Sequence, residues 1–265
     1  MTKITSQQNP KIKQIRALNQ RKQRGKQGLF AVEGIRHIGE AVEAGAKMEF
    51  LLYASDLLVS DYAHSIIQQL SETGTLCLDT TEEIFTALSG KEHPQGILAV
   101  VRQNLTPLDK LNPENFPWGV ALVSPQDPGN LGAILRTIDA VGASGLIVLE
   151  NSVDVFHPTA VRASMGALFW KSVTYASFQQ FTDWVQKHNH HIYGSSARGE
   201  TNHDHVDYQA PAILLMGSER EGLSNEHAQI CEAVVKLPMR GKSTSLNLAV
   251  ACGILLYQMG EHLLK

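Results

Sequence analysis

The chain has 265 residues, 43% of them hydrophobic, which is enough for a packed core in one large domain or two ordinary ones. The formal net charge is only −3, so no overall excess of one charge indicates a partner. The local distribution of charge is therefore more informative. The three cysteines form no C-x-x-C pair and come without a secretory signal, which predicts reduced thiols in a cytoplasmic protein.

Residues 1–32 contain no acidic residue and form the one strong charge run of the chain. Ile12, Ile15 and Leu18 recur in it at helical spacing, which predicts an ordered helix with one apolar side. Clustered cations are typical of phosphate binding in nucleic acid, whereas a solvated helix face or an organelle-targeting segment would share this composition. The cations of the run are Lys3, Lys11, Lys13, Arg16, Arg21, Lys22, Arg24 and Lys26.

Residues 1–102 alternate strand-like and helix-like segments, which predicts an α/β domain. The expected strands are 29–34, 49–54, 75–79 and 96–102, and the expected helices are 35–45, 62–72 and 81–89. Residues 103–117 contain three prolines and little apolar periodicity, which predicts a linker.

Residues 118–265 resume the alternation and form the second expected domain. Several of the strands are apolar throughout, as buried parallel strands are. The expected strands are 119–124, 145–150, 191–196, 212–217 and 233–238, and the expected helices begin near 131, 160 and 245. The apolar segment 246–257 is shorter than the ~20 residues that cross a bilayer, so we expect a buried helix and no membrane partner.

Three polar segments follow strands of the second domain. In the first, Asp127 or Asn130 is expected to cap a helix. Arg136 stands between Leu135 and Thr137 on that largely apolar helix, where a buried guanidinium needs either a structural salt bridge or a substrate anion.

The second polar segment, residues 217–223, has Gly217 at a strand end, which permits a tight turn or a close ligand approach. The third contains "GKST" (residues 241–244), which matches the second half of a phosphate-loop pattern. The first glycine of that pattern is replaced by Lys236, so a nucleotide-hydrolysing enzyme is disfavoured. Ser245 is a plausible helix cap, and Asn247 in the first turn of an apolar helix predicts a specific hydrogen bond.

Histidines gather at residues 188–191 and 203–205. Their spacing is not that of a zinc site and no cysteine accompanies them, so a solvated loop is expected and no metal is predicted.

The three polar segments, in this order, resemble the motifs of the SpoU (TrmH-like) branch of the SPOUT RNA methyltransferases. The family motifs read approximately N-x-G-A-I-x-R-T, G-x-E-x-x-G-L and I/L-P-M-x-G-x-x-x-S-L-N. They match residues 130–137, 217–223 and 237–247, within a similarity that covers 118–265. The N-terminal part is similar to the substrate-binding domain of members that act on ribosomal RNA, which is itself similar to ribosomal protein L30e.

The resemblance implies an α/β fold in which an L30e-like domain precedes a SPOUT domain, a parallel sheet with a trefoil knot. It implies a homodimer that transfers a methyl group from S-adenosylmethionine to a ribose 2′-hydroxyl. The two-domain layout favours large-subunit ribosomal RNA, and transfer RNA remains the alternative substrate. A non-catalytic RNA-binding protein is less favoured, because the residues that carry the reaction are present.

The resemblance also implies roles for individual residues. The catalytic site would comprise Arg136, Asn130, Glu219, Ser245 and Asn247. The cofactor would be held by Gly217, Leu237, Leu246, Met216 and Met239, and RNA by Lys11, Lys13, Arg21, Lys22 and Arg162.

Overall fold

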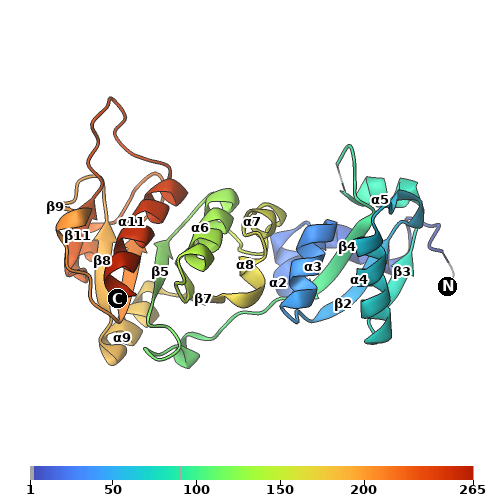
Figure 1. The fold of residues 1–265 in the computed structure, drawn as a ribbon, viewed down its shortest axis with the longest axis horizontal. Coiled ribbons are helices and arrows are strands. Elements are labelled where there is room, and N and C mark those ends of the chain that lie inside the picture. Colours follow the sequence, from blue (N-terminus) through green and yellow to red (C-terminus); the bar gives the residue numbers. More distant parts are fainter. Residues whose placement is uncertain (1–2, 90, 265) are drawn as a thin grey trace. The chain divides into compact units, whose positions relative to one another are not determined.

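The computed structural model describes residues 3–89 and 91–264, which form two compact units (Figure 1). The first unit comprises Met1–Gln103 and Phe156–Phe169, and the second comprises Asn104–Val155 and Trp170–Lys265. The sequence division placed 156–169 in the C-terminal domain. Instead, the rings of Phe156 and Phe169 lie 4.8 Å and 6.3 Å from the ring of Phe30, and this aromatic cluster holds the segment in the first unit.

The first unit is built on a four-stranded sheet in which β4 lies between β1 and β2, antiparallel to both. The edge strand β3 is parallel to β2. All four strands expected from the sequence are present. In the order of the sheet they are β1 (Leu29–Glu33), β4 (Ile97–Arg102), β2 (Met48–Tyr53) and β3 (Cys77–Asp79).

The expected helices of this unit are also present, and α4 begins one residue earlier than predicted. The helices are α1 (Pro10–Ala17), α2 (Arg21–Gln27), α3 (Ile35–Glu43), α4 (Asp61–Glu72), α5 (Glu82–Ser89), α7 (Pro158–Ala163) and α8 (Ala167–Trp170), whose last residue belongs to the second unit, with the short 3₁₀ helix η1 (Ser55–Leu57).

The helix α1 has the one apolar side that its sequence predicts. Ile12, Ile15 and Leu18 are buried in a core that includes Phe50. One cation of the basic run is structural, because the buried guanidinium of Arg24 donates to the carbonyl oxygens of Leu18 and Asn19 at 2.8 and 3.0 Å. Arg24 is therefore not part of a phosphate-binding surface.

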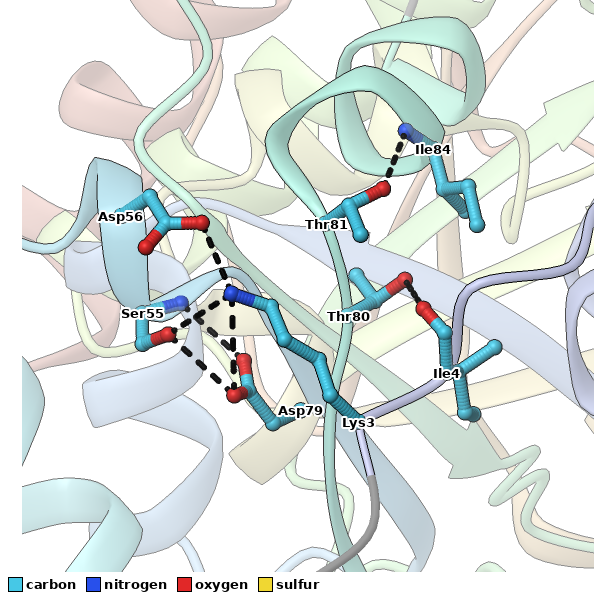
Figure 2. A network of polar contacts seen from close by, with 8 residues as sticks. All are labelled: Lys3, Ile4, Ser55, Asp56, Asp79, Thr80, Thr81 and Ile84. Carbon is cyan, nitrogen blue, oxygen red and sulfur yellow. Dashed lines mark hydrogen bonds and ion pairs between the residues drawn. The ribbon is translucent and has the colours of Figure 1, made fainter.

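The segment before α1 is attached to the edge of this sheet (Figure 2). The amide of Ile4 donates to the carbonyl of Asp79 at 2.8 Å, and the hydroxyl of Thr80 donates to the carbonyl of Ile4 at 2.9 Å. The ammonium of Lys3 lies 2.7 Å from a carboxylate oxygen of Asp56 and 4.0 Å from one of Asp79. Lys3 thus has carboxylate partners within the protein.

The second unit is built on a seven-stranded sheet in which every pairing is parallel. The chain runs outward from β5 through β6 to β7, and the later strands lie on the other side of β5. Open parallel sheets bind ligands at such a reversal, beyond the carboxyl ends of the strands. In sheet order the strands are β7 (Ser172–Ala176), β6 (Gly145–Leu149), β5 (Trp118–Val123), β10 (Ala212–Met216), β8 (His191–Ser195), β11 (Ala233–Lys236) and β9 (Thr201–Asn202).

The helices of the second unit cover this sheet, and α6 packs against α11. They are α6 (Pro128–Ala140), α9 (Phe178–His188), α10 (Asn225–Gln229) and α11 (Leu248–Leu263), with the 3₁₀ helices η2 (Leu108–Lys110) and η3 (His203–His205). Within 103–117, Leu111 and Phe116 are buried in the core of this unit, and the indole of Trp184 donates to the carbonyl of Leu111 at 2.8 Å. The trefoil knot stays a prediction.

Candidate active site

Three loops converge at the carboxyl ends of β5, β10 and β11, because these strands are parallel members of one sheet. They are residues 124–127, 217–223 and 237–247, which contain or adjoin the three polar segments of the sequence. The structure therefore brings together segments that lie far apart along the chain.

The first loop enters α6 through Asp127. Its carboxylate accepts hydrogen bonds from the backbone amides of Gly129 at 2.6 Å and Asn130 at 3.1 Å, and Pro128 occupies the first turn. Asp127 is thus the helix cap, one of the two residues that the sequence proposed. Asn130 is left with its side-chain amide available for other contacts.

The third loop ends at Asn247, which is the cap of α11. Its side-chain oxygen accepts from the amides of Ala249 at 2.9 Å and Val250 at 3.3 Å. The expectation that the helix begins near Ser245 with that serine as its cap is wrong. Ser245 is exposed and lies two residues before the cap, because the asparagine oxygen satisfies two of the free amides at the helix start.

A hydrogen-bonded chain joins the three loops through Asn130. The Asn130 amide nitrogen donates to Glu219 at 2.9 Å, and the Asn130 oxygen accepts from the Asn247 amide nitrogen at 2.9 Å. The specific hydrogen bond predicted for Asn247 is confirmed. Each member has one orientation that satisfies its partners, so the three side chains fix one another.

The carboxylate of Glu219 also accepts from the backbone amides of Gln126 at 3.1 Å and Asp127 at 3.4 Å. Burial raises the pKa of Glu219, but the hydrogen bonds from Asn130, Gln126 and Asp127 outweigh that effect and leave the pKa below its ordinary value. Glu219 is therefore ionised near neutral pH and is a poor proton acceptor. It orients Asn130 and the loop after β5.

Sequence reasoning did not find Gln126, which supports this loop in two ways. Its backbone bonds to Glu219, and its side chain donates to the carbonyl of Ser124 at 2.9 Å. Ser124 has φ of +50°, a left-handed conformation that a serine rarely adopts, directly after β5. No sequence signal marks Gln126 apart from its place in a turn.

Arg136 is exposed on α6, contrary to the expectation of a buried guanidinium. Within the described part of the chain it forms no hydrogen bond or ion pair, which leaves its charge available to a substrate. It does not join the chain of Glu219, Asn130 and Asn247, and Ser245 also lies outside that chain.

Gly217 makes a tight turn, one of the two roles that the sequence left open. A Cβ atom on this residue would lie 2.0 Å from the backbone of Gly222, and the amide of Gly222 donates to the carbonyl of Ser218 at 3.0 Å. The turn places the loop 217–223 against itself and holds Glu219 toward α6.

The loop after β11 suits a ligand with polar edges and an apolar body. Among the described residues, those numbered 238–246 make no backbone hydrogen bond, so their donors and acceptors are available. Met216 is buried, Leu237 and Met239 are partly buried, and Leu246 is 39% exposed. The "GKST" residues lie in this exposed loop and not at a helix start, which removes the basis of a phosphate loop.

The residues expected to bind RNA all belong to the first unit. Lys13, Arg21, Lys22 and Arg162 are exposed. Lys11 is partly buried, with its ammonium 4.4 Å from the centre of the Phe50 ring, so part of its role is a cation–π contact within the unit.

His190 corrects the expectation of a solvated histidine loop. It is only 5% exposed, its ring lies 4.3 Å from that of Trp184, and Nε2 donates to the carbonyl of Phe116 at 3.0 Å. Burial lowers the pKa of His190 below its ordinary value. The hydrogen bond with Phe116 raises this pKa by a smaller amount, and the neighbouring His188 lowers it further. His190 is a core residue held in the neutral form.

The fold and site define an α/β protein with a candidate ligand site at the carboxyl edge of an open parallel sheet. The chain belongs to the SpoU rRNA methylase family, whose model matches residues 117–257. A second model, the MRM3-like substrate binding domain, matches residues 9–99.

Two relatives align with this chain over almost its whole length. The 23S rRNA (uridine(2479)-2′-O)-methyltransferase of Streptomyces viridochromogenes is 33% identical, with 97% of this chain and 91% of the relative covered. The 23S rRNA (guanosine(2553)-2′-O)-methyltransferase RlmP of Bacillus subtilis (strain 168) is 28% identical, with 98% and 99% covered.

Among solved structures, an AdoMet-bound rRNA methyltransferase from Sinorhizobium meliloti is 33% identical and covers 98% of both chains with a TM-score of 0.90. The SpoU methyltransferase AviRb from Streptomyces viridochromogenes, in complex with AdoMet, is 32% identical and covers 96% of this chain and 98% of its own with a TM-score of 0.86. In the described residues no helix has the length and apolar character to cross a membrane.

Proposed function

We propose that this protein transfers a methyl group from S-adenosylmethionine to a ribose 2′-hydroxyl of large-subunit ribosomal RNA. The observation that carries the proposal is the chain of hydrogen bonds from Glu219 through Asn130 to Asn247, which unites the three family motifs in one site. The family assignment makes the protein a methyltransferase, and the relatives named above act on 23S rRNA.

The share of this chain that each compared protein covers favours ribosomal over transfer RNA as the substrate. The relatives and structures named for ribosomal RNA span both units of this chain. A structure concerned with 2′-OH methylation of C/U34 on tRNA is 28% identical and covers only 55% of this chain, with a TM-score of 0.51. The first unit, Met1–Gln103 with 156–169, is thus the part that we assign to recognition of ribosomal RNA, and we propose a cytoplasmic location for the protein.

We assign the cofactor to the loop of residues 237–246 with Met216 and Gly217 behind it. The available backbone donors and acceptors of 238–246 would hold the polar edges of the cofactor, and Leu237, Met239 and Leu246 would contact its apolar surface. When bound, S-adenosylmethionine supplies an electrophilic methyl group on a sulfonium.

The chain must then stabilise the ribose oxygen as it loses its proton. Arg136 is suited to this, because a guanidinium is a permanent cation that keeps its charge beside a developing alkoxide. The same property makes Arg136 unsuited to accept the proton, so we infer that the proton passes to solvent water while Arg136 also binds a neighbouring phosphate of the RNA. Glu219, Asn130 and Asn247 hold the loops that align the reacting groups. Ser245 stays a candidate for contact with the substrate.

We further propose that the protein acts as a homodimer, as the resemblance implies. Val250, Ile254 and Tyr257 follow one another at helical spacing on α11 and are 51%, 42% and 61% exposed. A stripe of this kind, on a helix whose opposite face is buried, supports an interface with a second copy.

The experiment that tests the proposal is transfer of radiolabel from S-adenosylmethionine to total RNA of cells that lack the protein. The RNA is separated by size and digested to nucleosides. Label in a 2′-O-methylnucleoside of large ribosomal RNA is the expected result. Label in transfer RNA would change the substrate and keep the chemistry, and absence of cofactor binding would exclude the reaction.

A further inference from the structure

Trp170 has an exposure that the fold does not require. It is 46% exposed, whereas the other two tryptophans, Trp118 and Trp184, are 3% and 5% exposed in the core of the second unit. A large aromatic side chain with half of its surface in water has a face available to a ligand.

The indole of Trp170 is nevertheless held in one orientation. Its Nε1–H donates to a carboxylate oxygen of Asp139 at 2.8 Å, and the same oxygen lies 3.3 Å from the ammonium of Lys171. Lys171 in turn donates to the carbonyl of Ala143 at 3.1 Å. The hydrogen bond therefore restrains the ring in the free protein, and the charge of Asp139 is balanced by Lys171.

These contacts place Trp170 beside the helix that carries Arg136. Asp139 follows Arg136 by three residues on α6, so the two side chains are neighbours on one helix face. Arg136 has an exposed cation without a partner in the described chain. An aromatic face next to a free guanidinium is the combination by which proteins bind single-stranded nucleic acid, through base stacking and phosphate contact.

We propose that Trp170 contacts the RNA substrate by stacking on an unpaired base next to the ribose that Arg136 binds. This inference rests on the proposed function, because it takes RNA as the ligand of α6. A ribose in a regular helix is held by its stacked neighbours, so a base displaced from the stack needs a new partner. The fixed indole supplies that partner without ordering a side chain at the moment of binding.

A second copy of the chain is a less suitable occupant of this face. The apolar stripe of Val250, Ile254 and Tyr257 lies on α11 and is continuous, as an interface between copies requires. Trp170 is instead a single aromatic ring with Asp139 and Lys171 at its edge. Charged groups at the rim and one stacking face suit a base.

Fluorescence gives a direct test, because Trp118 and Trp184 are buried. The probe is large-subunit ribosomal RNA from cells that lack the protein. We expect this RNA to quench the emission of the wild type and to leave that of Trp170→Phe nearly unchanged at the same saturation. Equal quenching in both proteins would overturn the proposal.

Kinetics provide the second test. Trp170→Ala should raise the KM for this RNA by about 5-fold to 150-fold, the range for loss of one base stack, while kcat changes less than about twofold. Trp170→Phe should restore most of the affinity. Leu105→Ala, which removes a 40% exposed apolar side chain of the second unit, is the matched control and should leave KM unchanged.

Two outcomes separate this inference from the proposed function. Dissociation of the dimer by Trp170→Ala, with unchanged KM at saturating protein, would assign the ring to the interface and overturn the stacking contact. Quenching of the wild type by RNA without any methyl transfer would support the stacking contact and contradict the proposed reaction. Equal affinity of all variants for S-adenosylmethionine is the check that each has folded.

Discussion

The side chains of Asn130 and Asn247 are joined by a hydrogen bond of 2.9 Å although they lie 117 residues apart in the chain. Asn247 donates through its nitrogen to Asn130 and accepts with its oxygen from the first amides of α11. The start of α11 is thereby tied to the start of α6, and through Asn130 to Glu219. The contact couples the loop 237–247 to the helix that carries Arg136.

Replacement of Asn247 can separate its two roles. In Asn247→Asp a carboxylate oxygen still caps α11, and its charge suits the helix N-terminus, so the thermal midpoint should stay near that of the wild type. The contact with Asn130 loses its donor, because both facing atoms are then acceptors, and methyl transfer should fall at least tenfold. Asn247→Ala should lose both roles and about 1 kcal/mol of stability.

The measurements are thermal unfolding and initial rates with saturating RNA. Asn247→Ala is the control that shows the cost of losing the cap. Undiminished methyl transfer by Asn247→Asp would mean that the hydrogen bond to Asn130 has no part in the reaction.

Arg136 should be replaceable without loss of stability, because it is exposed and has no partner in the described residues. Arg136→Ala should unfold within about 0.5 kcal/mol of the wild type and be nearly inactive. Arg136→Lys keeps the charge that stabilises the alkoxide and should keep measurable activity. Methyl transfer and RNA affinity are measured together; complete inactivity of the lysine variant with intact RNA binding would contradict the positioning role.

The sequence predicts the four strands of the first unit and five of the seven strands of the second, because their apolar patterns are local, but it misses β7, β9 and the helix α9. It predicts a buried guanidinium for Arg136, which is instead exposed. Leu135 and Thr137 are its neighbours in sequence, but on a helix their side chains point about 100° away from it. The roles of Asn247 and Ser245 also depend on contacts with residues that are distant in the chain. Which of them caps α11 depends on where the loop 237–247 meets Asn130, and that follows from the order of strands in the sheet.

Distant contacts also decide which unit contains the segment 156–169 and whether His190 is buried. The segment 156–169 joins the first unit through aromatic contacts with Phe30, which no pattern within the segment encodes. His190 reads as polar in the sequence, yet the carbonyl of Phe116 provides a buried acceptor for it. Both depend on contacts between residues that are distant in the chain.

The basic segment should govern the salt dependence of RNA binding. Joint replacement of Lys11, Lys13, Arg21 and Lys22 by glutamine should weaken binding and flatten the plot of log affinity against log salt. The slope should change by about 0.7–0.9 for each phosphate that the variant no longer neutralises. The affinity for S-adenosylmethionine should not change.

Lys3→Gln is the control for this fourfold variant, because the ammonium of Lys3 already has Asp56 as its partner (Figure 2). It should leave the salt dependence of RNA binding as it is in the wild type. An unchanged slope in the fourfold variant would remove this segment from the RNA-binding surface.

The apolar stripe of α11 predicts the effect of a charge at its centre. Ile254→Asp should raise the dimer dissociation constant by roughly a hundredfold or more, because each copy loses about 1.5–3 kcal/mol of buried apolar contact. Sedimentation over a range of protein concentrations measures this change. Val59→Asp, at a site that is 95% exposed in the first unit, is the control and should remain dimeric. A stable dimer of Ile254→Asp would place the interface elsewhere.

His190 predicts a loss of stability on acidification. Burial lowers the pKa of His190 in the folded protein below its ordinary value of 6.5, so the unfolded chain binds a proton more readily. The stabilising contribution of the neutral ring is complete above pH 6.5 and is lost as the pH falls from there toward the lower pKa of the folded state. Burial also lowers the pKa of His188, which adds to the effect in the same direction.

The test compares thermal midpoints at pH 7.5 and pH 5.0. His190→Gln keeps a donor for the carbonyl of Phe116 but does not titrate, so its midpoint should fall less between the two pH values than that of the wild type. His205→Gln removes an exposed histidine and should reproduce the pH dependence of the wild type. If the thermal midpoints of His190→Gln and the wild type fall by the same amount between the two pH values, the acid sensitivity arises from groups other than His190.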